Sequence, residues 1–97
     1  MSYADNSQPI EGALRVWWIP QVPMRPFRRA VADLAQAALL IDALADYDMF
    51  QFENRIKPDY CNAGGVQVFR DGEWEDWYDE DGNDFDKWAR QQIDLAR

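Results

Sequence analysis

The chain contains no histidine and no threonine, and its only serines are Ser2 and Ser7. Without histidine, the sequence excludes His-based catalytic triads, histidine metal ligands and imidazole acid–base relays. Neither a GxxxxGK[ST] nor a GxGxxG motif occurs, so the two standard phosphate-binding loops are also excluded. We therefore expect a protein that is not an enzyme and needs no cofactor; carboxylates or Cys61 are the only groups left for catalysis.

Cysteine and long apolar runs are equally scarce. Cys61 is the single cysteine, so no disulfide forms within the chain and a reducing compartment such as the cytoplasm fits best. No apolar run approaches the roughly 18–20 residues of a membrane span. Residues 1–12 lack the basic and apolar regions of a signal peptide, and we expect them to be flexible.

What the sequence does contain is apolar and acidic. Of 97 residues, 47% are hydrophobic and five are tryptophan, and the net charge is −8. This composition is too apolar for a disordered acidic tail and predicts a packed core. The length predicts one domain over residues 1–97.

Two strands are predicted in the first third of the chain. Residues 14–19 are β-branched and aromatic, with large apolar groups on both faces, which is typical of a central strand. Residues 20–26 contain three prolines and cannot form a helix or a central strand. Residues 27–31 alternate between two faces and are predicted to form a second strand.

A helix follows these strands. Asp33 and Gln36 have the spacing of a capping box, and apolar residues recur at helical spacing after them. We expect the helix to end near Tyr47. Residues 50–65 show no sustained period and are predicted to form a long loop.

The last third of the chain predicts a hairpin and a helix. Residues 66–69 form a strand, Asp71 and Gly72 give the two-residue hairpin signal, and residues 74–78 form the return strand. Asp84 is placed to cap a final helix. The fold class is therefore α+β: a small antiparallel sheet, built from the two N-terminal strands and the C-terminal hairpin, is covered by the central and C-terminal helices.

Negative charge is concentrated near the C-terminus. Residues 71–97 contain ten acidic and three basic residues, a net charge of −7, and residues 1–70 carry only −1. This balance argues against binding to bulk DNA or RNA. It leaves two possibilities open: an acidic face over residues 71–86 that mimics nucleic acid, or a local arginine site for one small anion. Acidic residues at the surface also confer solubility alone.

Aromatic, cationic, amide and glycine residues occur together in two stretches of the chain. Aromatic rings stack on bases, arginine and lysine bind phosphate, amides read base edges, and glycines let backbone amides approach. These features predict a site for a small nucleotide-type anion. Its candidate residues are Trp17, Trp18, Arg25, Arg28, Asn54, Arg55, Lys57, Tyr60, Asn62 and Gly64, with its neighbour Gly65.

Structural interpretations of the same residues remain open. The tryptophans can belong to the core, and residues 50–65 can form a loop packed over the sheet, with its arginine paired to Glu53 or Asp59. Five tryptophans exceed what a small core readily holds, so a homo-oligomer or a ligand-stacking surface would use the excess. Residues 77–84 resemble a calcium loop but lack two essential ligands, and no metal site is predicted.

Two segments carry a resemblance to a known group of proteins. Residues 15–24 (RVWWIPQVPM), with Pro26 and Phe27, and residues 44–60 (LADYDMFQFENRIKPDY), with residues 62–65 (NAGG), resemble small phage-encoded accessory proteins. The likeness covers most of residues 14–82. It implies a non-structural protein made in the cytoplasm of an infected bacterium, and no catalytic residue is carried over.

Accessory proteins of this size and origin often counter host defences. The resemblance therefore leads to the hypothesis that the chain antagonises bacterial immunity by sequestering a nucleotide-type signal at the predicted site. The alternative is a protein inhibitor that presents the acidic face of residues 71–86 to a host defence protein such as a CRISPR effector. In both cases the protein acts by binding, with no direct contact to bulk nucleic acid or to a membrane.

Overall fold

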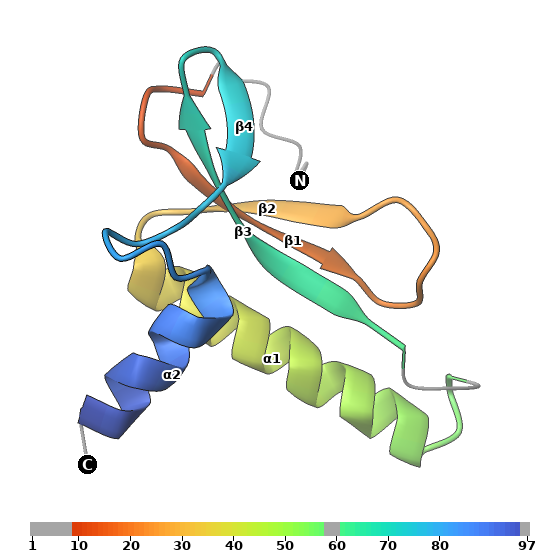
Figure 1. Cartoon of the computed structure of the whole chain (residues 1–97). Coiled ribbons are helices and arrows are strands. Elements are labelled where there is room, and N and C mark those ends of the chain that lie inside the picture. The colour runs from red at the N-terminus through yellow and green to blue at the C-terminus, as the bar shows by residue number, and fades with distance from the viewer. Residues whose placement is uncertain (1–8, 58–60, 96–97) are drawn as a thin grey trace.

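The computed structural model describes residues 9–57 and 61–95 and has the element order ββαββα (Figure 1). Strands β1 (Leu14–Ile19), β2 (Phe27–Val31), β3 (Ala63–Arg70) and β4 (Glu73–Asp76) form one sheet in the order β2-β1-β3-β4. Every neighbouring pair is antiparallel. Helices α1 (Leu34–Glu53) and α2 (Phe85–Leu95) complete the fold, and the predicted α+β class is confirmed.

Both helices pack on the same face of the sheet. Val16 of β1 and Val66 of β3 are directly opposite each other and form one buried cluster with Ala37 of α1 and Phe85 of α2. Side chains alternate between the faces of a strand, so the neighbours of Val16 and Val66 point to the other, uncovered face. β1 is an internal strand, as its two apolar faces predict.

The start of α1 follows the predicted capping box. The Asp33 carboxylate accepts a 2.8 Å hydrogen bond from the Gln36 backbone N–H, and the Gln36 side chain accepts one from the Ala32 N–H at 2.7 Å. Small side chains let the helix approach the sheet, and Ala37 is fully buried there. The predicted end near Tyr47 is wrong, because the helix continues to Glu53, where the Asn54 backbone N–H donates to the Phe50 carbonyl.

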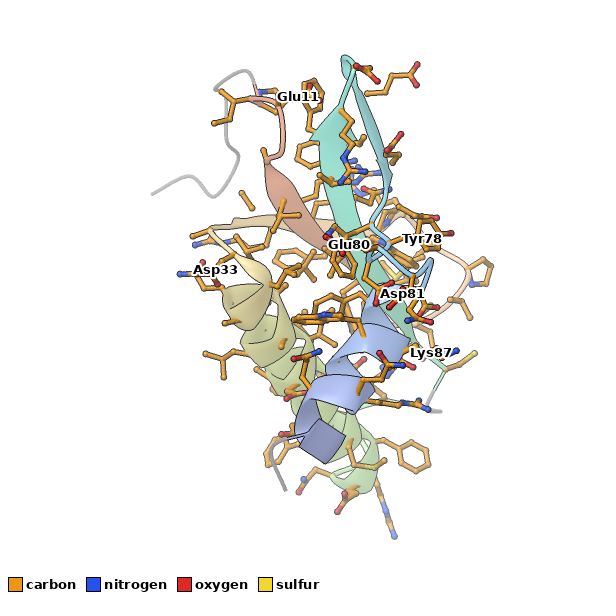
Figure 2. The ribbon with its side chains drawn as sticks, turned by 60° about the vertical axis from the view of Figure 1, so that its left-hand side comes forward. Glu11, Asp33, Tyr78, Glu80, Asp81 and Lys87 are labelled. Atoms are coloured by element: carbon orange, nitrogen blue, oxygen red, sulfur yellow. The ribbon has the colours of Figure 1, made fainter. Side chains whose placement is uncertain are left out.

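The hairpin between β3 and β4 turns where the sequence predicts. Asp71 and Gly72 have φ angles of 53° and 81°, which is the conformation of a two-residue type I′ turn. β3 starts at Ala63 and β4 ends at Asp76, so the predicted strand bounds shift by a few residues. The Asp71 N–H also donates to the Glu11 carboxylate, which fixes the lead-in to β1 beside the turn (Figure 2).

Aromatic rings attach α2 to the sheet. Trp77, which follows β4, packs edge-on against both Phe85 and Trp88, with centroids 6.0 and 5.6 Å apart. The Asp84 carboxylate caps α2 by accepting a hydrogen bond from the Lys87 N–H, as predicted. Neither described helix has the length and apolar character of a membrane span.

Candidate functional site

Three of the predicted ligand-binding side chains meet at a buried carboxylate instead of at a cavity. Asp48 of α1 is only 3% exposed. Its Oδ2 accepts hydrogen bonds from the indole of Trp18 at 2.9 Å and from the amide of Asn62 at 3.0 Å. Lys57 Nζ lies 3.4 Å from the other oxygen and also donates to the Pro20 carbonyl. We call Asp48, Trp18, Asn62 and Lys57 the Asp48 cluster.

The Asp48 cluster ties three parts of the chain together. It joins the end of β1, the second half of α1 and the segment that leads into β3. A buried carboxylate is stable only when it is paired and hydrogen-bonded, and here Lys57 and two N–H donors meet that condition. The polar groups of Trp18, Asn62 and Lys57 are therefore engaged with the protein itself.

Asp48 was missed as a site residue, although the sequence carried a signal for it. It lies four residues after Leu44 and seven after Ile41, on the helix face that packs against the sheet. A carboxylate on an apolar face requires internal partners. Sequence reasoning stopped the helix at Tyr47 and so did not place Asp48 on that face.

The predicted glycines are approached by tryptophans. A Cβ atom added at Gly64 would overlap the Trp18 ring, and one at Gly65 would lie 2.8 Å from the Trp17 ring. The two rings cover the glycine pair from opposite faces of the sheet. Trp17 and Trp18 consequently cannot stack on the same ligand.

The other predicted site residues are spread over the molecule. Arg25 lies exposed in the connection between β1 and β2, and Arg28 lies exposed on β2 opposite Trp17. Asn54 caps the end of α1, where its side chain donates to the Phe50 carbonyl at 2.8 Å. Arg55 is exposed just beyond this cap, with a φ angle of 60°. Tyr60 lies outside the described residues.

The uncovered face of the sheet carries positive charge. The Arg15 guanidinium stacks 4.1 Å from the centre of the Trp74 ring and donates to the Gln67 side chain at 2.8 Å. Burial, and then repulsion from Arg28, lower the pKa of Arg15 below its ordinary value. Two arginines thus lie near each other on this face.

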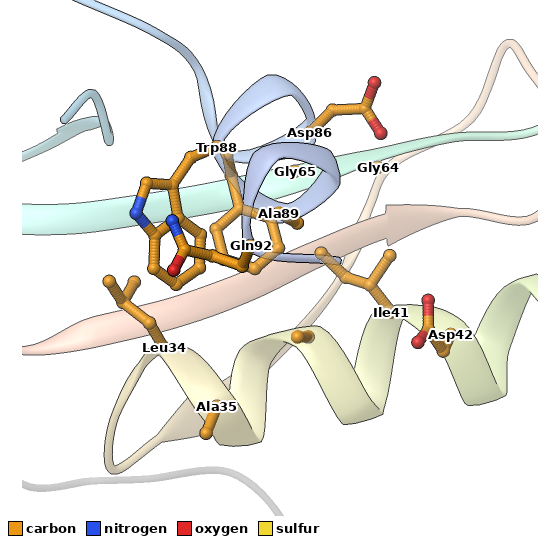
Figure 3. Close-up of a pocket in the computed structure, with 12 residues that line it drawn as sticks. Leu34, Ala35, Ile41, Asp42, Gly64, Gly65, Asp86, Trp88, Ala89 and Gln92 are labelled. Atoms are coloured by element: carbon orange, nitrogen blue, oxygen red, sulfur yellow. The ribbon is translucent and has the colours of Figure 1, made fainter. Parts of the chain in front are cut away.

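A groove with a volume of about 380 Å³ opens between the two helices (Figure 3). Its walls are apolar: Leu34 and Ile41 from α1 face Trp88 and Ala89 from α2. Among the described residues, its lining includes the carboxylates Asp42 and Asp86 and the amide Gln92 but no lysine or arginine. The described lining residues are Leu34, Ala35, Ala38, Ile41, Asp42, Gly64, Gly65, Phe85, Asp86, Trp88, Ala89 and Gln92. We call this feature the α1–α2 groove.

A second apolar surface lies on the outward side of α1. Its residues follow helical spacing, and the large ones are exposed: Leu39 by 72%, Tyr47 by 56% and Phe50 by 54%. The Tyr47 and Phe50 rings stack on each other with centroids 6.3 Å apart. We call Leu39, Ala43, Tyr47 and Phe50 the outward strip of α1. The helix contains four acidic residues and no lysine or arginine.

The acidic turn before α2 is held by one carboxylate. Asp79 accepts hydrogen bonds from the backbone N–H groups of Asp81 and Asn83, at 2.9 and 2.8 Å, and from the Asn83 side chain. These donors, with the Asn83 N–H foremost, lower the pKa of Asp79. Glu80 and Asp81 lie beside the start of α2 (Figure 2). Within residues 9–57 and 61–95, no group of three His, Cys, Asp or Glu side chains could hold a metal ion.

Comparison with known proteins identifies relatives for nearly the whole described chain. The profile of the family "Superinfection exclusion gene product 17" matches residues 13–95. The "Superinfection exclusion protein" of Salmonella phage P22 is 50% identical over 80 residues, which cover 69% of this chain and 78% of that protein. No solved structure matches the chain. The predicted relationship to small phage accessory proteins is confirmed.

The predicted function is wrong. The family and the P22 relative are named for superinfection exclusion, and this overturns both the sequestration of a nucleotide-type immune signal and the inhibition of a CRISPR effector. Polar groups that suggested a nucleotide site, those of Trp18, Asn62 and Lys57, serve the buried Asp48 instead. With its family match spanning residues 13–95, the chain belongs to the superinfection exclusion gene product 17 family.

Proposed function

We propose that this protein acts in superinfection exclusion, so that a bacterium containing it resists infection by another phage. The observation that carries this proposal is the 50% identity to the P22 protein of that name. Because the aligned region covers most of both chains, the relationship extends over the folded part of the molecule and not over one motif.

Exclusion by this chain is proposed to work through binding and not through catalysis. The sequence has no histidine or threonine to activate or supply a nucleophile. The buried carboxylate of Asp48 is engaged by Trp18, Asn62 and Lys57. Replacing the exposed thiol in a Cys61→Ala variant should leave exclusion unchanged. A loss of exclusion in that variant would point to thiol chemistry instead.

The outward strip of α1 is the surface proposed to bind the partner protein. Soluble proteins rarely expose several large apolar side chains together unless another molecule covers them. Asp42 and Asp46 flank the strip, and the helix has no basic residue, so the complementary partner surface is apolar and positively charged. We place this interaction in the cytoplasm of the bacterium, where a single unpaired cysteine remains reduced.

Infection of cells that express the chain tests the proposal. A prophage-free Salmonella strain would carry the gene on a plasmid, and the control strain would carry the same plasmid with the start codon removed. We expect at least one phage to plate less efficiently on the expressing strain while adsorbing normally to both. Equal plating of a broad panel of phages on the two strains would contradict the proposed function.

A further inference from the structure

The α1–α2 groove has the chemistry of a receptor for an apolar, positively charged segment. Its walls are formed by Ile41 and Trp88, and among the described residues the charged ones that line it are Asp42 and Asp86. Asp42 makes no ion pair within the part of the chain that the structure describes, and Asp86 pairs only with the exposed Arg90. The volume of about 380 Å³ lies within the roughly 300–1,000 Å³ range of pockets that bury a ligand.

The chain itself carries a segment of the matching chemistry. Residues 20–31, which span the β1–β2 connection and β2, contain three arginines and no acidic residue. Met24 is 50% exposed and Phe27 is 48% exposed, with the exposed Arg25 between them. Apolar side chains that alternate with guanidinium groups would fit a groove with apolar walls and carboxylates at its edge.

The β1–β2 connection and α2, which forms one wall of the groove, extend in opposite directions. In Figure 1 the connection between β1 and β2 extends to one side, and α2 extends to the other. A chain therefore cannot insert its own connection into its own groove. The two regions also differ in charge: residues 71–97 carry a net charge of −7, and all charged residues within 20–31 are positive.

We propose that two copies of this chain associate head to tail, with the β1–β2 connection of one copy inserted into the α1–α2 groove of the next. Met24 and Phe27 of the inserted copy contact Trp88 and Ile41 of the receiving copy. Arg25 reaches Asp42, where a guanidinium and a carboxylate form a bidentate pair. Such a contact uses two different surfaces, so each added copy leaves one basic end and one groove open.

Sedimentation velocity of the purified full chain tests this association. We expect the weight-average mass to rise above 11.4 kDa with increasing protein concentration and to fall again when salt is added. Asp42→Arg and Arg25→Asp should each weaken association at least about tenfold, because each places like charges in contact. Circular dichroism and a melting curve would confirm that both variants are folded.

Mixing the two charge-reversal variants is the decisive test of the proposed contact. The β1–β2 connection of an R25D copy, which now carries a carboxylate, should insert into the groove of a D42R copy and restore one contact. The remaining connection, that of the D42R copy, still carries Arg25, and the remaining groove, that of the R25D copy, still carries Asp42, so the second contact is the wild-type one. The mixture should therefore recover the concentration-dependent association that each variant alone has lost, with the two variants alternating in a 1:1 ratio. A mixture that stays monomeric, or a wild-type chain that stays monomeric at every concentration, would overturn the proposal.

Other outcomes identify a different occupant of the groove. Association that both variants leave unchanged would show that copies meet through another surface, such as the outward strip of α1, and would reject this contact. If residues 1–8 of the same chain filled the groove, copies would associate only after those residues are deleted. That result would also reject the proposed contact for the intact protein. Plating tests of R25D separate this result from the proposed function, because Arg25 lies in the β1–β2 connection and not on the outward strip of α1.

Discussion

The polar groups of the Asp48 cluster and those of the α1–α2 groove have opposite surroundings. At the Asp48 cluster, a carboxylate, an ammonium, an amide and an indole N–H satisfy one another with little exposure to solvent. In the α1–α2 groove, apolar walls and two carboxylates face open space. The difference separates residues that hold the fold from residues that are free to bind. We therefore expect substitutions in the Asp48 cluster to destabilise the fold and substitutions in the groove to affect binding.

The largest effect is expected at Asp48. An Asp48→Ala substitution leaves Lys57 buried without its counter-charge and Trp18 without an acceptor, so we expect the free energy of unfolding to fall by about 3–5 kcal/mol. Urea unfolding, followed by tryptophan fluorescence, measures the loss. Asp46→Asn on the exposed side of the same helix is the control and should cost less than about 0.5 kcal/mol. Similar values for both variants would show that the cluster does not stabilise the fold.

The next effect is expected at the glycine pair. In Gly64→Ala the new methyl group would overlap the buried Trp18 ring, so the free energy of unfolding should fall by about 1–3 kcal/mol. Gly65→Ala is the matched control, because its methyl group meets the half-buried Trp17 ring, which has room to move on the uncovered face. If Gly65→Ala lowered the free energy of unfolding more than Gly64→Ala, the uncovered face would be the more rigid one, which contradicts this account.

Filling the groove with a larger side chain should weaken self-association and leave stability nearly unchanged. Gln92→Phe places an apolar ring in open space, so we expect the free energy of unfolding to change by less than about 1 kcal/mol, while self-association weakens. Gln91→Phe, on the neighbouring residue outside the groove lining, is the control and should leave association intact. Strong destabilisation by Gln92→Phe would mean that the groove is closed in solution.

The acidic turn predicts a small dependence on pH. Because hydrogen bonds to the charged form lower the pKa of Asp79, its stabilising effect is complete above the ordinary pKa of an aspartate and is lost as the pH falls through the lowered value. Hydrogen exchange at the Asp81 and Asn83 amides should accelerate over that range, relative to the intrinsic rate. Asp79→Asn should remove this pH dependence; its persistence would assign the effect to another carboxylate.

The smallest effect is expected at the ion pair between Asp86 and Arg90. Their atoms approach to 2.9 Å, but both side chains are about three-quarters exposed, and solvent screens the attraction. Arg90→Ala should therefore change the free energy of unfolding by less than about 0.5 kcal/mol in urea unfolding. A loss as large as that of Gly64→Ala would show that this pair orders α2.

Local sequence signals predicted most of the fold. The Asp33 cap, the Asp71-Gly72 turn and the apolar periods of the strands and helices act through neighbouring residues, and each lies where it was expected. The extension of α1 to Glu53 was missed because its last turns are supported by partners distant in the sequence. Asp48, which looks like a helix-breaking polar position, is stabilised by Trp18 and Asn62 from other elements.

The site was less predictable than the fold for the same reason. Trp18, Lys57 and Asn62 were predicted to bind a ligand, and the sequence does not show that they share an internal carboxylate as a partner. The groove depends on the distance between α1 and α2, which is set by the aromatic contacts of Trp77, Phe85 and Trp88. Such distances follow from tertiary packing and not from local patterns.

The efficiency of plating on cells that express surface variants tests the central claim most directly. We predict that the wild-type chain and Ile10→Ser, which removes an even more exposed apolar side chain elsewhere, both exclude the challenging phage. The double variant Tyr47→Ser/Phe50→Ser should lose exclusion while keeping the wild-type unfolding curve. Full exclusion by this folded double variant would contradict the claim that the chain acts by binding a partner through the outward strip of α1.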